Sequence, residues 1–355
     1  MSKWKPRILV GMHHPKHYWM FKYLIREGKK KGWEFDILIS KKEVLEDLLK
    51  AEGVKYEVMG KNQPTLLGKL IELIRYIYHT YKCSRKFKPD VYLGPALPHF
   101  GLVSALRRSP YFILEDTEHV SLLHKITIPL CTAVITPSCF KKDFGKKHKR
   151  VNAYLELAYL HPHYFRPNPG VLKELGLKKN EKFFVLRFVS WEASHDVRQK
   201  GLTIEAKRKL IELLSKHGRV FISSEKELPK QFERYKLNIS PENIHQVLYY
   251  ATLHIGEGGT MVTESAVLGT PAIYVSSLIG TMGNFIELEN KYGLIYSFRD
   301  FDPAFSKVKE LIKYEHLKEK WSEKRQRLLQ DKADLTKSVI HLLEQGVDYN
   351  SFNKE

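Results

Sequence analysis

The chain has few cysteines and no long apolar run, and both shortages limit the kinds of protein it can be. Only Cys83, Cys131 and Cys139 occur among 355 residues, and no pair has C-x-x-C spacing. Such a set argues against a disulfide framework or a zinc site and indicates a reducing cytoplasm. No apolar run approaches the roughly 20 residues needed to cross a bilayer. The nearest, residues 126–136, is interrupted by Pro129. The start, MSKWKPRILVGM, fits one apolar strand rather than a signal peptide.

Acidic residues are scarce relative to basic ones. The chain carries 59 Lys and Arg against 40 Asp and Glu, a formal net charge of +19. This excess suits three classes of partner: nucleic acid, an anionic membrane surface, or phosphorylated substrates. The sequence has no helix-turn-helix, aromatic ribonucleoprotein motif or zinc spacing, which disfavours nucleic acid.

Strand-like and helix-like segments alternate along both halves of the chain, a pattern typical of α/β domains with parallel strands joined by right-handed crossovers. In the first half we predict strands at 7–12, 34–40, 54–59, 90–93, 111–114 and 132–136, and helices at 16–31, 41–51 and 66–87. In the second half we predict strands at 182–189, 219–223, 252–255, 271–275 and 294–296, followed by charged helices over 302–343.

A break divides the two halves. Residues 155–170, LELAYLHPHYFRPNPG, contain three prolines and a glycine without a clear period, which predicts a linker. We therefore expect two similar α/β domains with a cleft between them. Ligands bind beyond the carboxyl ends of the strands in open parallel sheets, so polar residues just after each strand are the candidates for a site.

The stretch GEGGTMVTESAVLGTP, residues 256–271, has the pattern of an anion site. Gly258 and Gly259 form a strand–helix turn, where glycine permits positive φ and close approach of a ligand. A helix starting near Thr260 points free N–H groups and its positive end at that ligand, which suits a pyrophosphate. Glu264 follows about one turn later, roughly 6 Å along the axis, where it can accept hydrogen bonds from ribose hydroxyls. The simpler interpretation is a tight turn with a solvated glutamate.

This stretch resembles the C-terminal-domain signature of the GT-B superfamily, which includes glycosyltransferases and the non-hydrolysing UDP-N-acetylglucosamine 2-epimerases. A closer resemblance is to an uncharacterised, mainly archaeal family of GT-B-like proteins. It covers nearly the whole chain, through ILVGMHHPKHYWMFKYL, LAYLHPHYFRP, VLRFVSWEASHD and IGEGGTMVTESAVLGTPAI. Together these motifs are specific for the fold and the nucleotide-sugar site, and not for the reaction.

The resemblance implies a GT-B-like α/β fold of two Rossmann-like domains whose parallel sheets face a cleft. Residues 1–160 would form the acceptor-side domain and 161–335 the nucleotide-sugar domain, with the helix and tail at 336–355 returning to the first. Gly258, Gly259 and Thr260 would meet the phosphates, and Glu264 the ribose. Arg187 and Ser190, at the end of the first strand of the second domain, would also meet phosphate oxygens. No cofactor is expected beyond the nucleotide sugar itself, with UDP as the expected nucleotide.

Acidic residues after the strand at 111–114 are the first catalytic candidates. The epimerases carry a glutamate that resembles Glu115 and takes part in proton transfer at the sugar ring. Asp116 lies beside it at the same strand end. The alternative is that Asp116 and Glu118 cap the next helix.

Histidines after two other strands are further candidates. His195 lies at roughly the place of an epimerase histidine, and with Asp196 it would act as a general acid–base, although the T-H-R-R-E-N-like run of the epimerases is absent. The alternative is an ordinary surface histidine. His14 and His17 follow the first strand, where many GT-B proteins have a glycine-rich loop, and would serve as a base or as phosphate donors. We expect no metal there, because the motif has no nearby carboxylate.

The run KKDFGKKHKR, residues 141–150, has six Lys and Arg against one Asp. A solvated basic face is the simplest interpretation. The sharper one is a patch for anionic lipid, where each basic residue contributes about 1 kcal/mol. That patch would suit a lipid-linked acceptor and peripheral attachment of a cytoplasmic enzyme to the inner face of the membrane.

Together these features predict glycosyl transfer from a UDP-sugar. Diphosphate would leave, its charge stabilised by a helix N-terminus, and the base would be Glu115 or a histidine of the first loop. One alternative is a 2-epimerase-like isomerase in which Glu115 and His195 move protons. Another is a non-catalytic protein that binds sugar nucleotides or polyanions.

Overall fold

The protein is represented by a computed structural model that describes residues 4–61, 65–178, 180–188, 202–224 and 227–345. The chain forms two compact units. The N-terminal unit comprises Met1–Tyr164 and Lys332–Glu355, and the C-terminal unit comprises Phe165–Asp331. The boundaries expected at 160/161 and 335/336 differ from these by four residues each.

The N-terminal unit is built on a parallel sheet of seven strands in the order β3-β2-β1-β4-β5-β6-β7. Its strands are β1 (Arg7–Met12), β2 (Glu34–Lys41), β3 (Glu57–Lys61), β4 (Val91–Gly94), β5 (Tyr111–Leu114), β6 (Ala133–Pro137) and β7 (His148–Val151). Its helices are α1 (Pro15–Lys30), α2 (Glu43–Ala51), α3 (Leu66–Phe87), α4 (Pro98–Arg107), α5 (Ser121–Thr127) and α13 (Leu335–Gln345), with 3₁₀ turns η1 (Ile128–Leu130), η2 (Gly145–Lys147) and η3 (Leu155–Ala158).

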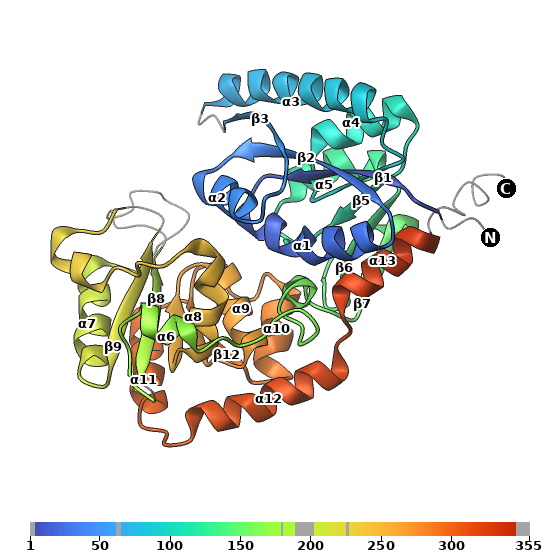
Figure 1. Cartoon of the computed structure of the whole chain (residues 1–355). Coiled ribbons are helices and arrows are strands. Elements are labelled where there is room, and N and C mark those ends of the chain that lie inside the picture. The colour runs from blue at the N-terminus through green and yellow to red at the C-terminus, as the bar shows by residue number, and fades with distance from the viewer. Residues whose placement is uncertain (1–3, 62–64, 179, 189–201, 225–226, 346–355) are drawn as a thin grey trace. The chain divides into compact units, whose positions relative to one another are not determined.

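The strand order determines which face of this sheet each helix covers. The chain first builds β1, β2 and β3 in one direction and then crosses back to place β4 on the other side of β1. Because crossovers between parallel strands are right-handed, α1 and α2 lie on one face and α3, α4 and α5 on the other. Figure 1 shows this division.

The core under α3 and α4 is a cluster of large buried side chains. It includes Leu9, Tyr92, Phe100 and Tyr111, and burial of each such side chain contributes about 1.5–3 kcal/mol. The packing is close enough to require glycine on β1. A Cβ at Gly11 would lie only 2.4 Å from Leu97 Cδ1 and 2.8 Å from Phe100 Cζ.

Part of the predicted linker is buried structure of the N-terminal unit. All four residues of η3 are buried, and α13 packs against η3 and α1. Asp334 precedes α13, accepts from the Lys337 N–H at 3.1 Å and lies 2.8 Å from His163 Nδ1. The Thr336 hydroxyl donates to the Ala158 carbonyl at 3.0 Å. These bonds fix the last described helix to the N-terminal unit, as the resemblance implied.

The C-terminal unit has a parallel sheet of five strands in the order β12-β11-β10-β8-β9. Its strands are β8 (Phe183–Phe188), β9 (Arg219–Ser224), β10 (Leu253–Gly256), β11 (Ala272–Val275) and β12 (Ile295–Phe298). Its helices are α6 (Gly170–Glu174), α7 (Ile204–Ser215), α8 (Ile244–Tyr250), α9 (Gly259–Leu268), α10 (Gly283–Asn290), α11 (Phe301–Leu311) and α12 (Leu317–Asp331), with 3₁₀ turns η4 (Lys230–Tyr235) and η5 (Pro241–Asn243).

The predicted alternation is confirmed, although helices α4 and α5 were not predicted and two strands differ from the prediction. The strand expected at 54–59 is β3, which begins at Glu57. The basic run at 141–150 contains a strand that we did not predict, β7 (His148–Val151), which pairs with β6. Among the described residues, no helix is both long and apolar enough to span a bilayer. Their cysteines Cys83, Cys131 and Cys139 are free thiols.

The end of α9 depends on a glycine. Gly269 has φ of 77° at the C-cap of α9, a conformation that side chains disfavour. A Cβ there would also lie 2.8 Å from Arg325 Cδ of α12. The Arg325 Nε donates to the Val267 carbonyl at 2.9 Å, so this contact helps to hold α12 on α9.

We expect Gly269→Ala to lower the free energy of unfolding by about 2 kcal/mol, about 1 for the left-handed backbone and the rest for displacing Arg325. The matched control is Gly176→Ala, in the same unit, where φ is 64° and a Cβ would meet nothing within 4 Å. It should cost about 1 kcal/mol. Equal losses in urea unfolding would show that the Arg325 contact contributes nothing.

Candidate functional site

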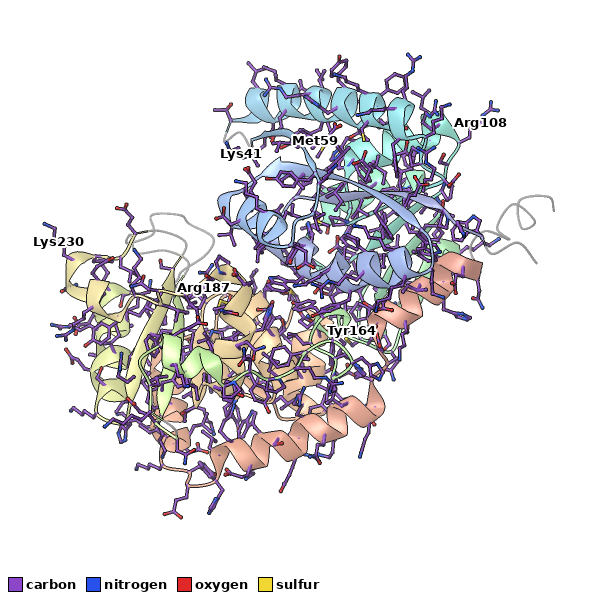
Figure 2. The ribbon with its side chains drawn as sticks, in the orientation of Figure 1. Lys41, Met59, Arg108, Tyr164, Arg187 and Lys230 are labelled. Carbon is purple, nitrogen blue, oxygen red and sulfur yellow. The ribbon has the colours of Figure 1, made fainter. Side chains whose placement is uncertain are left out.

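Five residues form one row across the sheet of the C-terminal unit, at the carboxyl ends of its strands. Arg187 pairs with Ser223 on one side and with Gly256 on the other, and Tyr274 links Gly256 to Ser297. The row therefore places a guanidinium, two hydroxyls and a phenol around a glycine. Figure 2 marks Arg187 at the end of β8, and its Nη1 donates to Ser223 Oγ at 3.0 Å.

Helix α9 begins just beyond this row. Gly258 is its N-cap, with φ of −95°, and supplies no capping side chain. Gly258, Gly259 and Thr260 are all partly exposed, so the first N–H groups of α9 lie near the surface of the unit. The expectation of positive φ is wrong for both glycines. Gly259 instead allows Phe285 to pack closely against the backbone of α9, since a Cβ at this position would lie 3.1 Å from Phe285 Cζ.

Glu264 is buried, which excludes the interpretation of a solvated glutamate. The residue is only 4% exposed, and Oε1 lies 3.0 Å from Nε2 of His245, which is itself buried on α8. The carboxylate is therefore fixed in place about one helical turn after the N-terminus of α9. His245 was not among the residues predicted from the sequence. Its position near the start of a short helix two elements earlier gives no pattern that points to Glu264.

Glu257, the acid inside the glycine turn, has a structural role. Its Oε1 accepts from the Leu202 N–H, and its Oε2 lies 3.5 Å from Nζ of Lys207, which is 1% exposed. Burial lowers the pKa of Lys207, and the nearby Glu257 opposes that change. Glu257 thus ties the turn before α9 to the start of α7.

His254, on strand β10, connects the sheet to α9. It is fully buried on β10, and its Nδ1 lies 2.9 Å from the hydroxyl of Ser265 on α9. Burial lowers the pKa of His254 to about 3, so the imidazole is neutral at physiological pH.

Two of the predicted residues, Ser190 and His195, lie outside the described residues.

In the N-terminal unit, the loop after β5 folds around the carboxylate of Glu115. Its Oε1 accepts from the N–H groups of Asp116 and Thr117, at 3.1 and 3.0 Å. Its Oε2 lies 3.6 Å from Nε2 of buried His124 on α5. Glu115 is 7% exposed, so this carboxylate and imidazole form a buried pair at the carboxyl end of β5.

Asp116 pairs with a lysine that sequence analysis did not identify. The Nζ of Lys16, in the first turn of α1, bonds to Asp116 Oδ2 and lies 3.8 Å from Oε1 of Glu156 on η3. Burial by itself lowers the pKa of Lys16, but Asp116 and Glu156 outweigh it and raise that pKa above its usual value. The capping interpretation is wrong: α5 has no side-chain cap, and Glu118 accepts instead from the Lys141 N–H at 3.2 Å.

His14 and His17 help to form the start of α1. His14 is its exposed N-cap, and its Nδ1 accepts from the Lys16 N–H at 3.1 Å. His17 Nδ1 accepts from the His13 N–H at 3.0 Å. Burial lowers the pKa of His17 well below the usual range, so it is a neutral imidazole whose Nε2 carries the proton. Next to them, His13 stacks on His99 with ring centroids 5.1 Å apart.

The basic run at 141–150 is more ordered than a solvated face. The Arg150 guanidinium donates to the carbonyls of Phe140 and Lys142, the latter at 2.7 Å. Lys147 Nζ donates to the Pro129 carbonyl at 2.7 Å. Part of the positive charge thus stabilises the edge of the sheet, where charged residues also discourage pairing with another strand.

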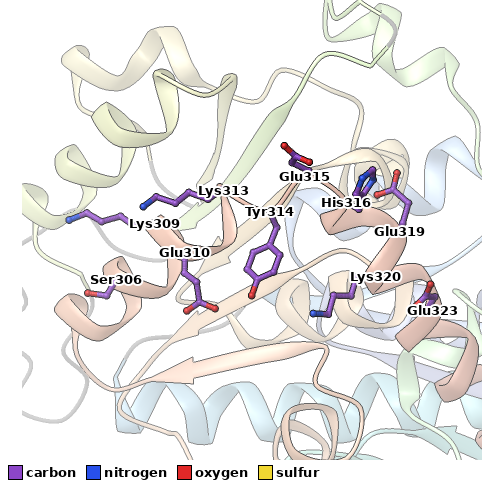
Figure 3. Close-up of a pocket in the computed structure, with 10 residues that line it drawn as sticks. All are labelled: Ser306, Lys309, Glu310, Lys313, Tyr314, Glu315, His316, Glu319, Lys320 and Glu323. Carbon is purple, nitrogen blue, oxygen red and sulfur yellow. The ribbon is translucent and has the colours of Figure 1, made fainter.

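A hollow of about 920 Å³ lies between α11 and α12, lined by charged side chains that include Lys309, Glu310 and Lys320 (Figure 3). Lys318 nearby donates to the Tyr249 carbonyl at 2.6 Å and to Thr270 Oγ1 at 2.8 Å. Both acceptors precede strands, so the hollow lies at the amino edge of the sheet. Ligands of parallel sheets bind at the opposite, carboxyl edge, which leaves the start of α9 as the candidate.

Replacing Lys16 by methionine should destabilise the protein by about 3 kcal/mol at neutral pH, because two buried carboxylates lose their counter-charge. The control Lys31→Met removes the more exposed pair with Glu344 and should cost less than about 1 kcal/mol. Urea unfolding measures both losses. A small effect of Lys16→Met would show that the buried pair does not stabilise the fold.

The same variant should change the response to alkali. The folded state raises the pKa of Lys16, so its contribution to stability is complete below the unfolded value of about 10.4 and is lost as the pH rises further. The native chain should therefore lose more stability than Lys16→Met above that pH. Parallel loss in the two proteins would contradict the raised pKa.

Comparison with known proteins agrees with this architecture. The chain is 24% identical over 322 residues to the uncharacterized protein MJ0665 of Methanocaldococcus jannaschii, covering 86% of this chain and 90% of that one. Its structure is similar to the S. aureus MnaA–UDP co-structure, with a TM-score of 0.68, 12% identity, and coverage of 97% and 96% of the two chains. It is also similar to spinosyn forosaminyltransferase SpnP, with a TM-score of 0.61, 13% identity, and coverage of 96% and 99%.

These structural matches show the fold: two parallel-sheet α/β domains of the GT-B type, shared with UDP-N-acetylglucosamine 2-epimerases and glycosyltransferases. The family model described as "Protein of unknown function (DUF354)" matches residues 7–343, nearly the whole chain. The chain therefore belongs to the DUF354 family.

Proposed function

We propose that this chain binds a nucleotide sugar, with UDP as the nucleotide, and transfers the sugar to an acceptor. The observation that carries the proposal is the pairing of two features of α9: a partly exposed N-terminus without a capping side chain, and a buried carboxylate, Glu264, held by His245 one turn later. A nucleotide sugar offers matching groups in the same order. Its diphosphate is an anion, which suits the helix N-terminus, and its ribose hydroxyls are hydrogen-bond donors, which suit the carboxylate.

The diphosphate would lie at the start of α9. The N–H groups after Gly258 and the positive end of the helix favour an anion there. Arg187 is the neighbouring cation, because its carbonyl accepts from the Glu257 N–H at 3.0 Å in the turn before α9. In transfer, charge grows on the leaving phosphate, and fixed N–H groups and a guanidinium stabilise that charge without reorganising.

Two features at the carboxyl edge of the C-terminal sheet suit the parts of the nucleotide sugar other than the diphosphate. Glu264 would accept hydrogen bonds from the ribose hydroxyls, with His245 fixing the carboxylate. A cavity of about 140 Å³, lined in part by Tyr274, Phe285 and Ser297, lies beside Gly259. Its size suits one ring rather than a whole nucleotide sugar.

The N-terminal unit would supply the acid–base groups. Glu115 is the strongest candidate, because two N–H groups orient one oxygen and His124 faces the other. Asp116 is bound to Lys16 and would position the loop rather than move protons. His14 is exposed at the start of α1 and remains the alternative base, whereas neutral His17 can only donate from Nε2.

Epimerisation is the second candidate reaction, and one observation favours it. The fold matches two 2-epimerase structures with TM-scores of 0.68 and 0.65, above the 0.61 of the forosaminyltransferase. One of them, from Neisseria meningitidis, is described as bound to UDP-GlcNAc. Transfer is preferred because the T-H-R-R-E-N-like run of the epimerases is absent from this sequence.

Glu264→Ala should weaken UDP binding about tenfold or more, since hydrogen bonds to a charged group contribute about 1.5–3 kcal/mol. Isothermal titration gives the dissociation constant. The matched control is Glu319→Ala, at the hollow on the amino edge, which should leave UDP affinity unchanged. Equal affinity in Glu264→Ala and the native chain would remove the ribose assignment.

Glu115→Gln should lower turnover by a factor of 100 or more, the order expected for a general acid or base, and leave UDP affinity unchanged. The assay supplies UDP-sugars with and without acceptor and follows products by mass spectrometry. Free UDP that appears only with acceptor indicates transfer, and an epimeric UDP-sugar without acceptor indicates isomerisation. Turnover that survives Glu115→Gln would exclude this carboxylate, and binding without any turnover would favour the non-catalytic alternative.

A further inference from the structure

Exposed apolar side chains gather on one face of the N-terminal unit. Among the described residues, fourteen large apolar side chains are exposed, and ten of them lie on α3, α4 and α5. These ten, which we term the α3–α5 apolar face, are Leu67, Leu70, Ile71, Ile74, Tyr78, Leu102, Leu106, Leu122, Leu123 and Ile126. Scattered exposed side chains need no explanation, but a concentration of this size indicates an interaction surface.

Helix α3 shows the feature most clearly, because it is apolar on two sides. Its inner side packs Tyr76 and Cys83 into the core. Its outer side carries Leu70, Ile74 and Tyr78, which are 55%, 61% and 61% exposed and are spaced four residues apart. A helix that only covers a sheet has a polar outer side, so the core of this unit does not account for these residues.

The three helices form one continuous face. The crossover geometry puts α3, α4 and α5 on the same side of the sheet, and α4 packs against both of its neighbours. In Figure 1 the three helices lie together, with α1 and α2 on the other side of the sheet. The apolar side chains therefore lie on one side of the unit.

Basic residues surround this face. Exposed Lys and Arg on or next to the three helices are Lys69, Arg75, Lys82, Arg85, Lys86, Lys88, Arg107, Arg108 and Lys125. Figure 2 labels Arg108 after α4. The only acidic residue within the three helices is Glu72, whose carboxylate accepts from the Tyr76 hydroxyl.

The basic run at 141–150 extends this rim along α5. Lys142 Nζ donates to Ser121 Oγ, at the start of α5, at 2.7 Å. Lys147 Nζ donates to the carbonyls of Ile128 and Pro129, just after α5, at 3.1 and 2.7 Å. The run is therefore adjacent in three dimensions to α5, which carries Leu122, although η1 and β6 separate the two in sequence.

We infer that the α3–α5 apolar face docks on an anionic lipid bilayer. Leu, Ile and Tyr with a basic rim are the side chains that enter the interfacial layer of a membrane and attract its phosphates. A second copy of this chain fits less well, because it would bring two basic rims together. The sequence alone suggested lipid contact only for the run at 141–150, and the structure adds the apolar part that the run lacks.

Docking of this kind indicates that the partner of the enzyme is carried in the membrane, as a lipid-linked acceptor would be. That consequence rests on the proposed function, whereas docking itself does not. Vesicle binding without nucleotide and UDP binding without vesicles are separate measurements, so either can fail while the other holds.

The test is flotation of the full chain with two kinds of vesicle: phosphatidylcholine alone, and phosphatidylcholine mixed with phosphatidylglycerol. The native chain should float with the anionic vesicles, much less with the neutral ones, and less as salt is added. Leu70→Ser combined with Ile74→Ser should lower the partition coefficient at least about tenfold. Lys82→Glu combined with Lys86→Glu should do the same.

Matched controls lie in the C-terminal unit. Ile204→Ser with Tyr314→Ser removes two other exposed apolar side chains, and Lys209→Glu with Lys216→Glu reverses two other exposed charges. Both should float like the native chain, and thermal unfolding verifies that every variant is folded. The inference is overturned if the native chain ignores anionic vesicles, or if the Leu70/Ile74 variant floats normally. It is also overturned if sedimentation shows a dimer that this variant converts to a monomer.

Discussion

Parallel strands direct all their carboxyl ends to one edge of a sheet, and in this protein the positions of the candidate site residues depend on that constraint. At this edge of the C-terminal unit, β8 contributes Arg187 and β10 leads through glycines into α9. In the N-terminal unit, β5 leads into Glu115 and Asp116, while β1 leads into α1, where Lys16 meets Asp116. Groups far apart in sequence come together because residues that follow parallel strands all lie at the carboxyl edge of the sheet.

Burial then gives each charged group at these edges a definite partner. A buried carboxylate without one is costly, and Glu264, Glu257 and Asp116 are each bound to a specific side chain. The consequence differs among them. Glu264 is fixed about one turn from the partly exposed N-terminus of α9, whereas Glu257 and Asp116 are occupied in joining helices to loops.

The sequence could predict elements that follow a repeating apolar pattern and motifs that lie within one short stretch. Apolar runs separated by helical periods predicted the two parallel sheets, and strands such as 7–12 and 111–114 have the expected limits. The order of glycine turn, helix and acid located α9 and Glu264. Strand β7 was missed because four residues within a basic run carry no apolar alternation, and only pairing with β6 makes them a strand.

Partners across the fold could not be predicted. His245, Lys16 and His124 act through contacts with residues that are 19, 100 and 9 positions away, and no local pattern signals such pairs. The exposed apolar side of α3 could not be predicted either. A sequence shows that a helix is apolar, but it does not show which side of that helix packs against the core. Only the packing of α3 against the core distinguishes Tyr76, which is buried, from Ile74, which is exposed.

We propose that the start of α9 recognises a diphosphate. It is tested most directly by isothermal titration of the native chain with UDP, UMP and uridine under the same conditions. We expect one UDP site per chain and an affinity that falls in the order UDP, UMP, uridine, because the helix N-terminus and Arg187 would bind phosphate. Uridine binding as tightly as UDP, or the absence of any UDP binding, would contradict it.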